Sequence, residues 1–478
     1  MASSNGDDSL KAAFDPEAFR HRAHQTVDVL ADYLSRALDG HGPVLPPIAP
    51  KDALARFQVD YDHAEPASLD TLLADVLAAS NHLHHPRYVG HQVAATLPTA
   101  ALAELVSGLL NNGMAVYEMG PAATALERHL LGWLGGKLGF RAADGVFTSG
   151  GSLGNLTALL AARHRATGGG EFPLTKLVLF VGADAHYSNR RAARVLGLPA
   201  DAVVPVAVDA RRKMRIDALR AAIADAKRAG KRALAIVASA CSTSTGSHDP
   251  LDAIADVAEE HGMWLHVDGA HGASAALSPK YRSLLAGIER ADSVVWDMHK
   301  MMMVPALVTA VLFRDGEHSF DAFHEEASYL FGNPRDEWFN VGHRTLECTK
   351  RMMSFTVHAA LRTHGVETFR TFVERQYDLA RELARRVREA PDFELAVEPE
   401  ANIVCFRHVP EGVSDVDPLQ PRIRGAMLER AEFYLVQTRI DGRWYLRTTL
   451  MNPRTGPADL DALLRDIRAV SASLLGPC

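Results

Sequence analysis

Short apolar runs alternate with amphipathic segments through the middle of the chain, between residues 176 and 313. Apolar runs of this length bounded by turn residues are typical of buried strands. The runs lie at residues 177–182, 203–206, 234–239, 264–267, 293–296 and 307–313, and helical patterns lie between them at 190–196, 216–229 and 250–261. This alternation predicts an α/β fold, with a mostly parallel sheet, helices on both faces, and ligands bound beyond the carboxyl ends of the strands.

Helical and proline-rich segments precede this region, and a second pattern of helices and strands follows it. At the N-terminus we expect a loose tail, a helix from Asp15 to Leu38, a proline-rich connector at 40–50 and a helix at 68–79. Amphipathic patterns predict further helices at 98–112 and 121–138. The C-terminal pattern predicts a long helix from residue 352, strands at 393–397, 403–407, 433–438 and 444–449, and a last helix at 458–474.

We therefore predict three parts: an N-terminal helical segment at 1–85, a large domain at 86–348 and a small C-terminal α+β domain at 349–478. The first part has too few apolar positions to form a core of its own. We expect it to wrap a second copy of the chain, which makes the protein a homodimer.

The composition is that of a globular protein, with 47% hydrophobic and 23% charged residues. The net charge of −7 provides no basic field for nucleic acid, and no run of about 18 apolar residues predicts a membrane span. The four cysteines lie far apart and the N-terminus is acidic, unlike a secretory signal, so a reducing cytoplasm is expected. The histidines of residues 82–91 lack a second ligand cluster, and no metal site is predicted.

A glycine-rich turn follows a predicted strand at 145–147 and precedes a predicted helix at 156–165. The turn reads TSGGSLGN, from Thr148 to Asn155. Backbone N–H groups at a helix N-terminus attract an anion, and glycines let the backbone approach it closely. The turn matches neither the dinucleotide nor the ATP pattern, so we expect the phosphate of another ligand. The alternative is an ordinary strand-to-helix turn capped by Ser152.

Three residues with ionisable side chains follow predicted strands: His186, Asp268 and Lys300. Lys300 precedes the apolar run MMMV, and burial without an anion lowers the pKa of a lysine and makes its amine a nucleophile. Each residue also has an ordinary alternative. Asp268 would be a helix cap, His186 a hydrogen-bonded loop residue and Lys300 a surface charge.

The glycine-rich turn, Asp268 and Lys300 together match the requirements of pyridoxal 5'-phosphate. A lysine amine binds the cofactor aldehyde as a Schiff base, an aspartate keeps the pyridine nitrogen protonated, and a Gly/Ser turn holds the phosphate. Because all three occur in one chain and in this order, the combination favours this cofactor over three unrelated features.

From about Pro86 to Pro453 the chain resembles the group II pyridoxal-phosphate-dependent decarboxylases, which include the aromatic amino acid, glutamate and cysteine sulfinate decarboxylases. The matching motifs are HPRYVGHQ, YEMGPAATALE, TSGGSLGNLTALLAAR, DAHYS, WLHVDGAHG, WDMHKMM, YLF and LRTTLMNP. The resemblance implies the fold-type-I PLP-dependent transferase fold and a homodimer with its active site at the subunit interface. It also implies release of CO2 from an L-amino acid to leave the amine.

The resemblance implies roles for individual residues. Lys300 would form the Schiff base, Asp268 would pair with the pyridine nitrogen, and His186 would stack on the ring. The other expected cofactor contacts are Gly151 and Ser152 at the phosphate, Thr243 beside the cofactor, Ala270 under the ring and His299 near the phosphate. Arg447 would bind a substrate carboxylate. Gln92 matches a glutamine that reads the substrate in the glutamate and cysteine sulfinate members, which points to an acidic substrate.

Two departures from the family pattern leave the reaction's outcome open. Asp297 stands where the family has asparagine. Residues 332–344 hold no tyrosine of the kind that protonates the substrate carbon after CO2 leaves, and Tyr329 belongs to the preceding YLF motif. The proton would then come from His186, a water or the partner subunit. The alternatives are an aldehyde-forming enzyme, a decarboxylase of aromatic or diamino acids, and a non-catalytic protein that binds the cofactor.

Overall fold

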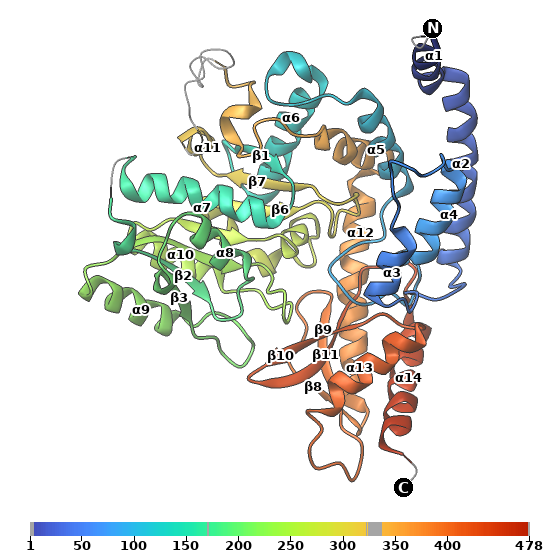
Figure 1. Cartoon of the computed structure of the whole chain (residues 1–478). Coiled ribbons are helices and arrows are strands. Elements are labelled where there is room, and N and C mark those ends of the chain that lie inside the picture. Colours follow the sequence, from blue (N-terminus) through green and yellow to red (C-terminus); the bar gives the residue numbers. More distant parts are fainter. Residues whose placement is uncertain (1–3, 170–171, 322, 324–336, 477–478) are drawn as a thin grey trace.

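Two β-sheets, one with seven strands and one with four, form the centre of the molecule (Figure 1). This computed structural model describes residues 4–169, 172–321, 323 and 337–476. The long helix α12 (Met353–Glu389) leads from the region of the large sheet to the small one. The predicted fold class, a large and mostly parallel sheet followed by a smaller α+β unit, is confirmed.

The large sheet has the strand order β1, β7, β6, β5, β4, β2, β3. Its strands are β1 (Asp144–Thr148), β2 (Leu177–Gly182), β3 (Val203–Val206), β4 (Arg232–Ser239), β5 (Leu265–Asp268), β6 (Ser293–Asp297) and β7 (Thr309–Phe313). Strands β2 to β6 run parallel, whereas β7 runs antiparallel to both β6 and β1. The carboxyl end of β1 therefore lies on the same edge of the sheet as the carboxyl ends of β2 to β6.

Helices cover both faces of the large sheet, so its central strands are buried along their whole length and are mostly apolar. One face packs on α7 (Gly151–Thr167) and α8 (Ser188–Val195). The other face packs on α6 (Pro121–Leu138), α9 (Ile216–Arg228) and α10 (Leu251–Glu260). Consecutive residues such as Val294 and Val295 belong to opposite cores. A shift of one residue would exchange the two cores, so the packing fixes the register.

The small sheet is antiparallel, with the order β10, β11, β9, β8. Its strands are β8 (Phe393–Leu395), β9 (Ile403–His408), β10 (Val436–Ile440) and β11 (Arg443–Thr449). It packs on α12, α13 (Leu419–Arg430) and α14 (Pro457–Leu475). Helix α12 is interrupted at Gly365, whose φ of 71° favours glycine. Helix α13 was not expected from the sequence, because Pro421 and Gly425 weaken its helical pattern.

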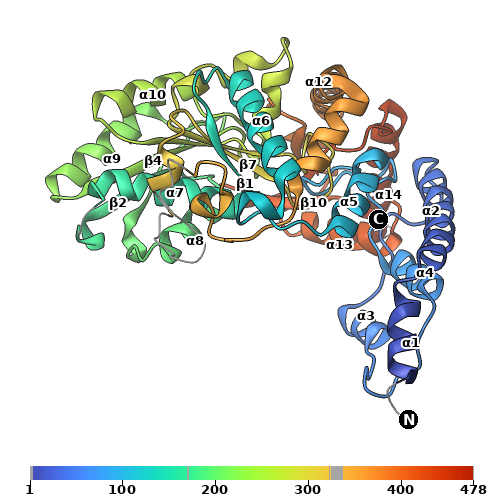
Figure 2. The same ribbon diagram turned by 90° about the horizontal axis from the view of Figure 1, so that it is seen from above.

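The N-terminal part consists of α1 (Ser4–Ala13), α2 (Pro16–Leu38), α3 (Pro50–Phe57) and α4 (Leu69–Ala79), and α5 (Pro98–Leu110) follows it. In Figure 2 the helices α1 to α4 extend away from the two sheets. Helix α2 starts as predicted, with the Asp15 carboxylate accepting a hydrogen bond from the backbone N–H of Glu17 at 3.0 Å. The prediction of a loose tail is wrong for residues 4–13, which are helical, and helix α3 was also not predicted.

The short helix α11 (His318–Asp321) follows β7. Between α11 and residue 337 the structure describes residue 323 alone. In the part of the chain that the structure describes, no helix combines the length and the apolar character needed to cross a membrane. The division of the chain at residues 85 and 348 stays a prediction.

Candidate active site

A cavity of about 260 Å³ opens at the carboxyl edge of the large sheet. Its walls come from the segments that follow β1, β2, β4, β5 and β6. Most of the residues singled out in the sequence line it together: Gly151, Ser152, His186, Thr243, Asp268, Ala270, His299 and Lys300. The predicted strand ends therefore converge on one place, as expected for the carboxyl edge of a parallel sheet. Gln92 and Arg447 are not among the lining residues.

The glycine-rich turn brings the N-terminus of α7 to this cavity. Gly150 has a φ of 104°, a conformation that favours glycine, and α7 begins at Gly151, five residues earlier than the sequence suggests. A Cβ on Gly151 would lie 3.0 Å from Oδ1 of Asp297, so this approach also favours glycine. The first N–H groups of a helix have no partner within the helix. They are available to an anion in the cavity.

Asp268 is the last residue of β5, and its carboxylate is held from the side by Asn155. The Asn155 amide donates to Oδ2 of Asp268 at 2.9 Å, and the backbone N–H of Ala270 donates to Oδ1 at 3.3 Å. Asn155 lies on the second turn of α7 and is buried, as is Asp268. The arrangement fixes the direction of the carboxylate before any ligand arrives.

The hydrogen bonds of Asn155 continue through His266 to the interior of the sheet. Oδ1 of Asn155 lies 3.0 Å from Nε2 of His266, whose Nδ1 lies 2.9 Å from the Ser293 hydroxyl. The indole N–H of Trp264 donates to that hydroxyl at 2.9 Å. An amide oxygen only accepts, so His266 carries its proton on Nε2 and accepts from Ser293 at Nδ1. Burial lowers the pKa of His266 to about 4, so the ring is neutral at physiological pH.

The same network determines the tautomer of His186. Asn155 donates its second amide proton to the Ser188 hydroxyl at 2.9 Å, and this hydroxyl lies 2.8 Å from Nδ1 of His186. The backbone N–H of Ser188 also points to Nδ1, at 3.3 Å. Nδ1 therefore accepts and Nε2 carries the proton. Burial lowers the pKa of His186, so the neutral ring is the main form at neutral pH.

Lys300 differs from its sequence-based prediction. Its amine is not surrounded by apolar groups alone, because Oδ2 of Asp297 lies 2.9 Å from Nζ. Burial by itself would lower the pKa of Lys300, but the Asp297 carboxylate, together with the smaller effect of Asp268, outweighs burial and the pKa is raised. The prediction of a lowered lysine pKa is therefore wrong. The sequence places Asp297 three residues earlier, but only the turn after β6 shows that the two side chains meet.

The other residues predicted to contact the cofactor line the same cavity as Lys300 and Asp297. His299 is buried, its Nδ1 lies 3.0 Å from the carbonyl of Val308, and its Nε2 lies 3.6 Å from Oδ2 of Asp297. Ala270 follows Asp268 by two residues, and Thr243 lies on the segment after β4. Both residues line the cavity.

Arg447 lies near the cavity, on strand β11 of the small sheet. It is buried, and its Nη2 donates to the Thr449 hydroxyl at 3.2 Å, while Nε has no partner among the described residues. Burial lowers the pKa of Arg447, and the nearby cavity residue Cys241 partly opposes this effect. Within the described part of the chain no carboxylate forms an ion pair with Arg447. It is therefore a buried cation available to an anionic ligand.

Gln92 belongs to an extended segment that runs beside the end of β11. The backbone N–H of Thr449 donates to the carbonyl of Val89 at 2.7 Å, which brings this segment to the strand that carries Arg447. The Gln92 side chain is buried, and Nε2 has no hydrogen-bond partner within the described residues. A buried amide without a partner is costly, so it too is suited to a polar ligand.

The segment expected to replace the tyrosine-bearing loop is described only from residue 337, and Tyr329 lies outside the described residues. Trp338 packs under the guanidinium of Arg128, 4.2 Å from the ring centroid. Phe339 contacts the ring of Tyr117 edge-on at 5.6 Å. Neither aromatic residue lines the cavity.

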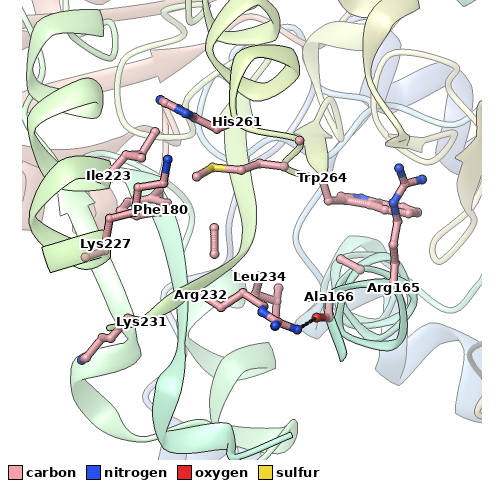
Figure 3. Close-up of a pocket in the computed structure, with 15 residues that line it drawn as sticks. Arg165, Ala166, Phe180, Ile223, Lys227, Lys231, Arg232, Leu234, His261 and Trp264 are labelled. Carbon is pink, nitrogen blue, oxygen red and sulfur yellow. Dashed lines mark hydrogen bonds between the residues drawn. The ribbon is translucent and has the colours of Figure 1, made fainter. Parts of the chain in front are cut away.

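A larger cavity of about 460 Å³ lies at the opposite, amino edge of the sheet (Figure 3). In Figure 3, Lys227 lies near Phe180, whereas Arg165 lies beside Trp264 on the other side of the cavity and Arg232 lies between them. Arg165 and Lys227 lie in the last turns of α7 and α9, and Arg232 donates to the carbonyl of Ala166 at 2.8 Å. Helix C-termini carry partial negative charge, which accounts for these cations. The cavity contains none of the predicted site residues.

Sequence reasoning missed Asn155, His266 and Ser188 as parts of the site. All three are buried polar residues in apolar surroundings. Asparagine is unfavourable inside a helix, and a histidine within a buried strand needs hydrogen-bond partners. These two exceptions to the apolar pattern were the available signal. The partners themselves come from α7, α8, β5 and β6, and only the fold brings them together.

The residues at the carboxyl edge fit pyridoxal phosphate. The open N-terminus of α7 beside Gly151 suits the phosphate, and the Lys300 amine suits the aldehyde. The Asp268 carboxylate, fixed by Asn155, suits a protonated pyridine nitrogen. Each group of the cofactor thus has a partner of matching chemistry in one cavity.

Comparison with known proteins identifies the same chemistry. Residues 51–409 match the family model described as the pyridoxal-dependent decarboxylase conserved domain. The acidic amino acid decarboxylase GADL1 of Bos taurus is 31% identical over 82% of this chain and 79% of its own length. The cysteine sulfinic acid decarboxylase of Rattus norvegicus is also 31% identical, over 82% of this chain and 83% of its own length.

A solved structure extends this similarity to the fold. The crystal structure of mouse CSAD in its apo form superposes with a TM-score of 0.87 and 27% sequence identity, covering 96% of this chain and 99% of that chain. The sequence-based resemblance and the predicted cofactor are thereby confirmed. The chain belongs to the pyridoxal-dependent decarboxylase family and is a pyridoxal-phosphate-dependent amino acid decarboxylase.

Proposed function

We propose that this decarboxylase acts on an acidic L-amino acid and releases CO2 and the corresponding amine. The observation that carries the proposal is Arg447, a buried guanidinium without a carboxylate partner among the described residues, which suits the carboxylate that every amino acid has. The acidic side chain of the substrate rests on the names of the relatives. A buried unpaired cation is unfavourable, and a substrate carboxylate would remove this cost. The names of the relatives, acidic amino acid decarboxylase and cysteine sulfinic acid decarboxylase, support the same substrate class. Gln92, with its unpartnered amide nitrogen, would contribute a further polar contact.

Pyridoxal phosphate, when bound, supplies a protonated pyridine ring that takes up the electron pair left on the substrate carbon as CO2 departs. We propose that Lys300 holds the cofactor aldehyde and that Gly151 and Ser152 hold the phosphate. Asp268 would keep the pyridine nitrogen protonated. Its hydrogen bond from Asn155 supports this role, because that bond directs the carboxylate into the cavity.

The remaining cofactor contacts are proposals of the same kind. His186 would stack on the ring, Ala270 would pack under it, Thr243 would lie beside it, and His299 would approach the phosphate. All four line the cavity with Lys300.

The proton that completes amine formation would come from His186. No tyrosine lines the cavity among the described residues, so the usual phenolic donor has no counterpart there. His186 carries its proton on Nε2, because Nδ1 accepts from Ser188. The lack of a tyrosine in the sequence of residues 332–344 also favours a second candidate, in which oxygen intercepts the reaction and an aldehyde forms. Quantifying amine, aldehyde, ammonia and peroxide with and without oxygen separates the two.

A second copy of the chain would complete the enzyme as a homodimer, with the active site at the subunit interface. The support is an exposed apolar stripe on α5, formed by Leu102, Leu105, Val106 and Leu109. Residues at this spacing share one helix face. Exposed apolar residues of α2 and α4 add to the same side of the molecule: Phe19, Val27, Leu30, Leu69, Leu72 and Val76. A cytoplasmic location stays a prediction from the scattered cysteines.

The test is CO2 release from glutamate, aspartate and cysteine sulfinate, compared with aromatic and diamino acids. Acidic substrates should react fastest, and Arg447→Gln should lower kcat/KM for them roughly 10- to 100-fold, the value of one or two charge-assisted hydrogen bonds. Arg439→Gln is the matched control, because Arg439 is exposed on the neighbouring strand β10. Preference for aromatic or diamino substrates would refute the acidic substrate, and equal effects of the two variants would refute the role of Arg447.

A further inference from the structure

The carboxylate of Asp297 lies inside the site, in contact with the amine of Lys300. Asp297 ends β6, and its side chain is only 3% exposed. Oδ2 lies 2.9 Å from Nζ of Lys300, and Oδ1 accepts a hydrogen bond from the Thr309 hydroxyl at 2.5 Å. Thr309 is the residue directly opposite Asp297 in the antiparallel pairing of β6 and β7. The carboxylate is therefore fixed between the lysine and the adjacent strand.

The charges around this pair favour an ionised state for both partners. Burial would raise the pKa of Asp297, but Lys300, His299 and Thr309 outweigh it and the pKa is lowered. The opposite balance raises the pKa of Lys300, where Asp297 outweighs burial. The other ionisable groups facing the pair from neighbouring segments are Asp268, His186, Cys241, His271 and His299.

Three of these groups are kept neutral at neutral pH by burial. Burial lowers the pKa of His186, lowers that of His271 to about 3 and raises that of Cys241 to about 12. None of the three carries a charge that competes for the lysine nitrogen. Asp268 is directed to Asn155 and the backbone of Ala270. Asp297 is thus the carboxylate in direct contact with Lys300.

We propose that Asp297 is the counter-ion of the Lys300 nitrogen, both in the free lysine and when that nitrogen carries the cofactor. The inference rests on the proposed role of Lys300 in the preceding section. A family resemblance places asparagine at this position, and an amide cannot carry the negative charge. This chain would therefore keep its lysine nitrogen protonated to higher pH than a site with asparagine.

The covalent step would be formation of the C=N bond between the Lys300 nitrogen and the cofactor aldehyde. The Lys300 ammonium gives one proton to Asp297, and the neutral amine forms a bond to the aldehyde carbon. The carbonyl oxygen leaves as water, taking up the proton from Asp297 and a second proton from the nitrogen. The third proton stays on the new C=N nitrogen, which is then a cation beside the Asp297 carboxylate. No oxidant or reductant is required. A substrate amine would release the lysine by adding to the same carbon, and the Lys300 nitrogen would then take up a proton from the incoming amine and leave.

The experiment is a pH titration of the visible absorbance of the holoenzyme, because the protonated and unprotonated C=N forms absorb at different wavelengths. In Asp297→Asn the midpoint should fall by about one pH unit or more, since an opposite charge in direct contact has been removed. Asp292→Asn is the matched control. Asp292 precedes the same strand, and its Oδ1 pairs with Arg314 at 3.0 Å outside the cavity. Its midpoint should equal that of the natural protein.

Two further measurements keep the test decisive. Thr309→Val retains the charge but removes the hydrogen bond that directs it, and it should shift the midpoint in the same direction by a smaller amount. It replaces Asp297→Asn if that variant does not fold. An unchanged midpoint in a folded, cofactor-loaded variant overturns the counter-ion role. If instead Lys300 does not bind the cofactor, so that the proposed function itself fails, borohydride treatment of the natural protein would attach the cofactor to another lysine.

Discussion

Replacing Asn155 by leucine tests the network that directs Asp268. Leucine is close to asparagine in size, so the substitution removes hydrogen bonds without leaving a large cavity. Three bonds are lost, to Asp268 and Ser188 at 2.9 Å each and to His266 at 3.0 Å. Ser188 retains its contact with His186 at 2.8 Å. The carboxylate of Asp268 and the Nε2–H of His266 are left without these partners.

The expected magnitude follows from those two groups. A buried polar group without its partner costs about 1–3 kcal/mol, and more when it is charged. We therefore expect the free energy of unfolding of the apoenzyme to fall by about 2–5 kcal/mol. Cofactor affinity should also weaken, because Asp268 is no longer held in one direction. A loss of about 10- to 100-fold corresponds to roughly 1.4–2.8 kcal/mol.

The assays are urea unfolding of the apoenzyme and absorbance titration with pyridoxal phosphate. Thr157→Val is the matched control, because Thr157 is buried on the same helix and its hydroxyl donates to the backbone carbonyl of Leu153 at 2.9 Å. That variant should lose less than about 1 kcal/mol and bind the cofactor normally. If Asn155→Leu loses stability but keeps full cofactor affinity, the network supports the fold alone. If both quantities are unchanged, the derived hydrogen bonds are wrong.

Two shorter predictions address the lysine and the interface. Lys300→Ala should abolish the visible absorbance of the linked cofactor and turnover together, and peptide mapping after borohydride treatment of the natural protein should find the cofactor on Lys300. Either normal turnover in the variant or a label elsewhere would contradict the assignment. Placing glutamate at both Leu105 and Leu109 should convert a dimer to monomers in light scattering, whereas Val195→Glu, an exposed apolar position on α8, should not. Identical masses for all three proteins would refute an interface at α5.

The strand-end residues are predictable because one simple rule places them. Parallel strands buried on both faces are recognisable as apolar runs, and ligands bind where those runs end. This rule locates Asp268 and Lys300 from the amino-acid pattern alone. The N-terminal helix α1 escapes prediction for the opposite reason. Its sequence, SNGDDSLKAA, has no apolar stripe that would mark a buried face.

Asn155 and His266 show where such reasoning ends. Each is an exception within an otherwise apolar element, and the exception alone indicates that a partner exists. It does not identify the partner. Asn155 is 113 residues from Asp268 in the chain, and His266 is 111 residues from Asn155. Their meeting depends on α7 packing on one face of the sheet with its N-terminus at the carboxyl edge, which is a property of the packed layers.

The Lys300–Asp297 pair depends on the packed layers in the same way. The apolar residues after Lys300 predict a lysine in apolar surroundings, and nothing in the sequence joins its amine to the Asp297 carboxylate. The antiparallel pairing of β7 with β6 places Thr309 opposite Asp297, and the turn after β6 returns the lysine to the same carboxylate. The local sequence pattern therefore predicts Lys300 as the reactive residue, whereas the pairing of β6 with β7 fixes the carboxylate that lies beside its amine.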